Sequence, residues 1–70
     1  MNDLLLNKNI YVKRNIQVVI EVFKKLCKVT IEENSKYWEL TFSECVYDKT
    51  RTVKEFENYL IDYINSEGSI

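Results

Sequence analysis

The stretch Cys27-Lys-Val-Thr-Ile-Glu-Glu-Asn-Ser-Lys-Tyr-Trp-Glu-Leu-Thr-Phe42 decides the fold that this sequence predicts. Side chains of opposite character alternate on both sides of Asn34-Ser35, which is typical of two strands that each have one buried face. A two-residue loop at Asn34-Ser35 would place every large apolar side chain on one face, and a shift of one residue would scatter them. The predicted pairs are Glu33 with Lys36, Ile31 with Trp38, Val29 with Leu40 and Cys27 with Phe42.

Two segments precede this hairpin. We expect a short strand at Lys8–Val12, after a loose start over residues 1–7. Residues 14–26 fit both a strand, through alternating β-branched residues, and a helix, through i, i+3, i+4 spacing. A length of thirteen residues is long for a strand in so small a domain, so we predict a helix with Asn15 as its cap.

The segment after the hairpin has a clear helical pattern. Thr52 and Glu55 have the spacing of a capping box, in which the two side chains bond the first turn of the helix. We expect residues 66–70 to be a loose end. One apolar stripe follows the predicted cap and consists of Val53, Phe56, Leu60, Tyr63 and Ile64.

The predicted order is strand, helix, strand, strand, helix. Because a helical crossover joins the first two strands, we expect the first strand to lie beside the third. The sequence therefore predicts an α+β fold: a small two-layer sandwich with a three-stranded antiparallel sheet in the order 1-3-2 and both helices on one face. In that arrangement the strand that begins at Cys27 lies at an edge of the sheet, where charged side chains limit self-association.

Composition indicates one small domain over residues 1–70, with 46% hydrophobic and 30% charged residues. No apolar run is long enough to span a membrane, and the start Met1-Asn2-Asp3 has no basic signal region. Cys27 and Cys45 do not form a Cys-x-x-Cys pair, so we expect two reduced thiols in a cytoplasmic protein.

The residues that usually carry catalysis are scarce. The chain has no histidine, one glycine and no cysteine or carboxylate group with the spacing of a metal site. A phosphate-binding glycine loop is therefore impossible, and no base adjoins Ser43 or Cys45 in a convincing pattern. We expect a non-catalytic protein without metal or cofactor.

Charge is unevenly distributed although the net charge is −1. Residues 1–30 carry six basic and two acidic side chains, whereas residues 31–70 carry four basic and nine acidic ones. This asymmetry fits either a charged partner or two solvated faces that attract each other within the fold. Nucleic-acid binding is disfavoured, because no basic stripe is continuous and Glu32 and Glu39 lie on the predicted outer face of the hairpin.

Two segments resemble a known family. Asn9-Ile10-Tyr11-Val12, running into an apolar helix and a hairpin, and Glu55-Phe-Glu-Asn-Tyr-Leu-Ile-Asp-Tyr63 resemble the small His-Xaa-Ser system protein HxsD and its relatives. The chain lacks the Leu-Arg-Glu type of ending of that family after Tyr63. The family is encoded beside radical SAM enzymes that modify ribosomally made peptides. The resemblance implies an accessory protein that binds a precursor peptide or the modifying enzyme.

An open sheet edge is compatible with this role, because an extended peptide can add to it as a further strand. The candidate partner-binding residues on the edge strand or its outer face are Lys28, Thr30, Glu32 and Tyr37. The same residues also fit an ordinary solvated sheet face. Two alternatives remain: a small mobile-element or phage-type inhibitor that binds a larger protein machine through its acidic half, and a homodimer whose exposed strands pair.

Overall fold

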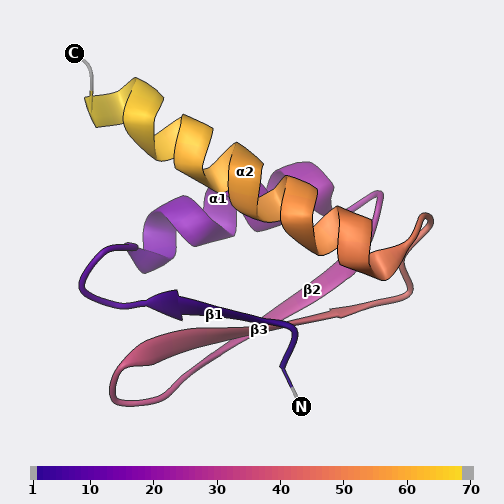
Figure 1. The fold of residues 1–70 in the computed structure, drawn as a ribbon, viewed down its shortest axis with the longest axis horizontal. Helices are drawn as coiled ribbons and strands as arrows, with labels where there is room; N and C mark the ends of the chain where they lie inside the picture. The colour runs from indigo at the N-terminus through magenta and orange to yellow at the C-terminus, as the bar shows by residue number, and fades with distance from the viewer. Residues whose placement is uncertain (1, 69–70) are drawn as a thin grey trace.

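The computed structural model describes residues 2–68. They form β1 (Leu4–Asn7), α1 (Lys13–Phe23), β2 (Lys28–Glu33), β3 (Tyr37–Ser43) and α2 (Lys49–Gly68). The strands make one antiparallel sheet in the order β1-β3-β2, and both helices lie on the same side of it (Figure 1). The predicted α+β fold, the strand order and the edge position of β2 are confirmed.

The first strand lies earlier in the chain than predicted. Leu4–Asn7 pairs with β3, so the predicted strand at Lys8–Val12 is wrong, and four of the seven residues of the expected loose start form a strand. Asn7 ends β1 with a turn. Its side-chain Oδ1 accepts the N–H of Asn9 at 2.8 Å, and its main-chain carbonyl accepts the N–H of Tyr11 at 2.9 Å. This turn leads the chain away from the sheet and leaves Ile10 exposed.

Residues 14–26 are mainly helical, as predicted, but the helix begins without the expected cap. Val12 is the N-cap and makes no side-chain bond, whereas Asn15 lies inside α1 and is buried. The helical i, i+3, i+4 pattern prevails because it buries one face of α1 against the sheet and α2, formed by Ile16, Val19 and Phe23.

The hairpin has the predicted faces but a different register. Glu33 lies opposite Trp38 rather than Lys36, and every other pair is shifted by the same two residues. Asn34 produces the longer loop, since its Oδ1 accepts the N–H groups of Lys36 at 2.8 Å and Tyr37 at 2.7 Å. Side chains alternate with a period of two, so a shift of two keeps the apolar face intact.

The last helix begins earlier than the predicted capping box. Asp48 accepts the N–H of Arg51 at 3.0 Å and so acts as the cap, whereas Thr52 lies in the first turn and donates its hydroxyl to the carbonyl of Asp48 at 2.9 Å. The helix continues to Gly68, so residues 66–68 are not a loose end, and residues 69–70 lie outside the described range.

The core lies between the helices and the sheet. The predicted stripe of α2 faces it, with Phe56 and Leu60 fully buried. The ring of Phe56 contacts Phe42 at 5.2 Å and Phe23 at 5.3 Å between centroids, both edge to face. This aromatic group joins one strand and both helices. The buried apolar residues are Leu6, Ile16, Val19, Phe23, Cys27, Leu40, Phe42, Phe56 and Leu60.

The two cysteines are joined, and the expectation of two reduced thiols is wrong for this structure. Cys27, just before β2, forms a disulfide with Cys45, just after β3. The main-chain N–H of Val46 also donates to the carbonyl of Leu26 at 2.7 Å. Glu44 lies between the end of β3 and Cys45. Its φ of 52° is in the left-handed region and turns the chain back toward β2. The open end of the hairpin is therefore closed by a covalent bond and a hydrogen bond.

Candidate functional site

One side of β2 has no neighbouring strand within residues 2–68. The N–H of Asn34 donates to the carbonyl of Tyr37 at 3.0 Å, which fixes the direction of the main-chain groups along the ladder. Because these groups alternate along a strand, Lys28, Thr30 and Glu32 direct theirs toward β3. The N–H and C=O groups at the open side of β2 belong to Val29, Ile31 and Glu33.

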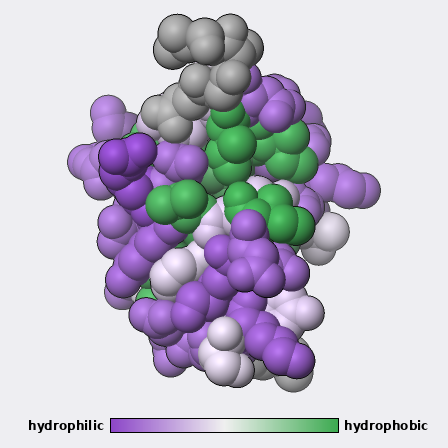
Figure 2. Space-filling model, turned by 90° about the vertical axis from the view of Figure 1, so that its left-hand side faces the viewer, coloured by the Kyte–Doolittle hydropathy of each residue, from purple (hydrophilic) through white to green (hydrophobic). Residues whose placement is uncertain are grey.

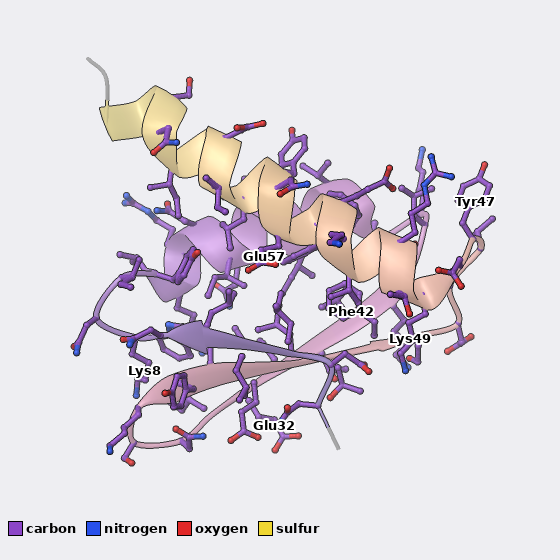
Figure 3. All side chains as sticks on the ribbon, viewed as in Figure 1. Lys8, Glu32, Phe42, Tyr47, Lys49 and Glu57 are labelled. Atoms are coloured by element: carbon purple, nitrogen blue, oxygen red, sulfur yellow. A yellow bond between two sulfur atoms is a disulfide. The ribbon has the colours of Figure 1, made fainter. Side chains whose placement is uncertain are left out.

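The predicted residues of β2 lie together on the sheet face away from the helices. Lys28, Thr30 and Glu32 are all exposed. In Figure 3, Glu32 projects below the sheet, whereas Phe42 projects above it toward α2. Along β2, side chains with opposite charges therefore stand on either side of a small polar residue, on a surface that the helices leave open.

Tyr37 lies on the same face but not where the predicted register placed it. The residue opposite Glu32 is Glu39, while Tyr37 lies opposite Asn7 of β1 and next to the hairpin loop. Tyr37 is 37% exposed. The structure therefore brings Lys28, Thr30 and Glu32 into one row along the edge. It places Tyr37 on the neighbouring strand β3, at the end next to the hairpin loop.

Glu39 also lies on this face, although sequence reasoning did not select it as a candidate. Its carboxylate accepts hydrogen bonds from the side-chain amides of Asn2, at 3.1 Å, and Asn34. The charge of Glu39 is thus engaged by neighbours, whereas Glu32 has no ion-pair partner among the described residues. Alternation alone placed both carboxylates on the face, but only the register shows that they lie opposite each other.

The end of β2 next to the hairpin loop is held by Lys8. Its Nζ lies 2.7 Å from the carboxylate of Glu33 and 3.1 Å from the carbonyl of Asn34. It also lies 4.9 Å from the centre of the Trp38 ring, in a cation–π contact. The hydrogen bond and charge of Lys8 lower the pKa of Glu33. Glu33 is therefore occupied within the fold, and the unpaired charges of β2 are Lys28 and Glu32.

Other features of the described surface define a binding site less clearly than the open edge of β2 does. Within residues 2–68, no three histidine, cysteine or acidic side chains are grouped as metal ligands would be. Neither helix in that range is long and apolar enough to cross a bilayer. Figure 2 shows apolar side chains on the helical half of one side, above a mainly hydrophilic half. An open hollow also runs along α1, beside Arg14, Val18 and Val22. The lining of this hollow mixes apolar and charged side chains, and two of the charged ones, Glu21 and Lys24, form an ion pair with each other.

The segments that carry the family resemblance serve the fold. Asn9–Val12 forms the turn that leads into α1, and Phe56 and Leu60 of the second segment lie in the core. Neither segment contributes a side chain to the open edge. No protein-family model matches this chain, and no match was found among curated proteins or among solved structures.

Proposed function

We propose that this protein is a non-catalytic accessory protein that binds an extended peptide segment by adding it as a strand to β2. The observation that carries the proposal is the open side of β2, where Val29, Ile31 and Glu33 present main-chain donors and acceptors. Main-chain hydrogen bonds supply affinity in this mode of recognition, and alternate side chains supply selectivity.

The side chains next to the edge define the peptide that would fit. Lys28 lies at one end of β2 and Glu32 near the other, and both are exposed. A bound strand would therefore carry an acidic residue opposite Lys28 and a basic residue opposite Glu32. The small side chain of Thr30 between them leaves room for a larger side chain in the partner.

The resemblance noted above suggests the source of such a segment. It implies a precursor peptide of a peptide-modifying radical SAM enzyme, or an extended segment of that enzyme. Leader peptides have no fold of their own to give up, so they can adopt the extended conformation that strand addition requires, at the cost of ordering the chain.

The test is a titration of isotope-labelled protein with a candidate leader peptide, followed by amide NMR. We expect the largest shifts at Val29, Ile31 and Glu33. A second peptide, N-methylated at alternate residues on the side that faces β2, should not bind, because it lacks the donors. Shifts confined to α2, or equal binding of both peptides, would contradict strand addition.

A charge reversal gives a matched control on the protein. Lys28→Glu should weaken a peptide that has an acidic residue at the facing position and should favour one with a basic residue there. Lys54→Glu makes the same change of net charge on the exposed surface of α2. It should leave the affinity unchanged if the peptide lies along β2, and an equal loss in both variants would indicate a non-specific charge effect.

A further inference from the structure

We infer that β2 is also complementary to itself, and that two copies of this chain associate by antiparallel pairing of their β2 edges about a two-fold axis at Thr30. The two sheets, each in the order β1-β3-β2, would join into one continuous sheet. The inference goes beyond peptide binding, because it names a second copy of the chain as the occupant of the edge and does not depend on the peptide.

Charge complementarity is the first argument. In a two-fold antiparallel pair centred on Thr30, Lys28 of one copy lies directly opposite Glu32 of the second copy, and Glu32 lies opposite Lys28. All four side chains project from the face away from the helices, where they are exposed. Both cations therefore face a carboxylate across the edge, and cross-strand pairs of opposite charge stabilise a sheet.

The main chain supports the same alignment. Val29 of one copy lies opposite Ile31 of the second, and these residues direct their N–H and C=O groups toward the open side. They are thus positioned for reciprocal hydrogen bonds. Their side chains lie on the face covered by the helices and are only partly buried at the edge of the core. Pairing the two edges would remove more of this apolar surface from water.

Other alignments of the two β2 strands do not pair Lys28 with Glu32. An axis at Ile31 would place Val29 against Glu33 and Lys28 against the uncharged Asn34, and an axis at Val29 would place Lys28 against Thr30. A shift by one residue would set Val29 against Glu32, which projects from the other face of the sheet. Only the axis at Thr30 pairs each unpaired charge of β2 with its opposite while keeping apolar side chains together.

The charges of this strand are available for such a contact. Neither Lys28 nor Glu32 forms an ion pair within the described part of the chain. Glu33, which would add a further negative charge near the edge, is already paired with Lys8. Charged side chains usually keep an edge strand apart from other strands, but here their order along β2 selects one partner strand, its own copy.

Charge reversal on the full chain tests the inference. Lys28→Glu and Glu32→Lys each create two like-charge contacts in the proposed homodimer. Sedimentation from micromolar to millimolar protein should show association of the wild type and at least about tenfold weaker association of either variant. Both positions are exposed, and circular dichroism checks that each variant is folded. The double variant K28E/E32K restores complementarity and should associate within about threefold of the wild type.

Mixing the two single variants is the decisive measurement. One copy then presents two carboxylates and the other two ammonium groups, so the mixture should form a heterodimer that native mass spectrometry detects. In a mixture of labelled and unlabelled wild type, an intermolecular NOE is expected between the α-protons of Thr30, which face each other across the axis. A wild type that remains monomeric at millimolar concentration, or a mixture that fails to associate, would overturn the inference.

These outcomes are distinct from those of the peptide titration. A monomeric wild type whose β2 amides shift with peptide would remove the homodimer and leave the proposed function standing. If association of the wild type responds to the charge reversals as expected but no leader peptide binds, the homodimer stands and the proposed function is removed.

Discussion

The carboxylate of Asp3 accepts a hydrogen bond of 2.8 Å from the main-chain N–H of Phe42. Its other oxygen lies 3.0 Å from Nζ of Lys49, at the start of α2. The main-chain N–H of Asp3 donates in turn to the carbonyl of Leu40 at 2.8 Å. Asp3, which directly precedes β1, therefore connects the central strand β3 to α2.

Removing this carboxylate should destabilise the domain. Asp3→Ala leaves the N–H of Phe42 without its acceptor, and the expected loss is about 2 kcal/mol in the free energy of unfolding. Asp3→Asn keeps an acceptor oxygen and should lose less. Urea denaturation followed by circular dichroism measures the difference, with Asp62→Ala on the exposed side of α2 as a control. Equal stability of the Ala variant and the wild type would contradict the role of Asp3.

The same contact predicts a pH dependence. The hydrogen bond from Phe42, aided by Lys49, holds the pKa of Asp3 below its ordinary value of 3.8. A lowered pKa in the folded state means that the stabilisation is present above the unfolded value and is lost as the pH falls through the folded value. Stability should therefore fall below about pH 4 in the wild type, and Asp3→Asn should lack this part of the decline.

The disulfide should contribute to stability through the unfolded chain. Cys27 and Cys45 are 18 residues apart. Closing a loop of that length lowers the entropy of the unfolded state and so raises its free energy by about 3 kcal/mol. We expect reduction, or Cys45→Ala, to lower the unfolding free energy by a similar amount. The Ala variant should then be insensitive to reductant. Two titratable thiols in protein prepared without reductant would show that the bond is not formed.

The aromatic group in the core should be sensitive to truncation. Phe56 is fully buried and contacts the rings of Phe42 and Phe23, so Phe56→Ala should cost about 3–5 kcal/mol, much of the stability of so small a domain. Phe56→Leu keeps most of the volume and should remain folded. Tyr59, which also contacts Phe23 but is 44% exposed, is the matched control. A Tyr59→Ala variant as damaged as Phe56→Ala would contradict this description of the core.

The ion pair at the hairpin end predicts a shifted titration. Lys8 lowers the pKa of Glu33 first by its hydrogen bond and then by its charge, so Glu33 should titrate below its ordinary value of 4.5. The pair is intact above that value and is lost as the pH falls through the lowered pKa. Lys8→Met should raise the pKa of Glu33 in an NMR titration, whereas Lys54→Met, on α2, should not. No change in either variant would mean that the contact is absent in solution.

The sequence predicts side-chain faces better than it predicts where elements begin. Alternation around Asn34 identified the hairpin and its apolar face, because each face depends only on the parity of the residue number. The register depends on the loop, and there the Oδ1 of Asn34 accepts two main-chain N–H groups that favour a longer turn. In the same way, the turn at Asn7 placed the first strand at Leu4–Asn7.

The predicted register also gave no indication of the disulfide. In the predicted pairing Cys27 lies opposite Phe42, three residues from Cys45. In the structure the ladder is shifted by two, so Cys27 comes level with Glu44, and the left-handed turn at that residue brings Cys45 to it. The contact depends on two local geometries, neither of which is visible in the spacing of the cysteines.

For the candidate site, the edge position of the strand was predicted correctly, but the placement of its residues only in part. Lys28, Thr30 and Glu32 follow from alternation on an edge strand, whereas the position of Tyr37 required the register. That Val29, Ile31 and Glu33 present the open main-chain groups could not be read from the sequence, since it depends on which pairs of the ladder are hydrogen-bonded.

The alternating direction of the main chain in β2 divides one short strand into two populations of amide protons. Those of Lys28, Thr30 and Glu32 are bonded to the central strand and should exchange with deuterium slowly, whereas in the monomer those of Val29, Ile31 and Glu33 meet solvent and should exchange rapidly. A pattern with a period of two along six residues is thus the signature of a vacant edge, and whatever comes to occupy that edge will slow every second amide and leave the others as they were.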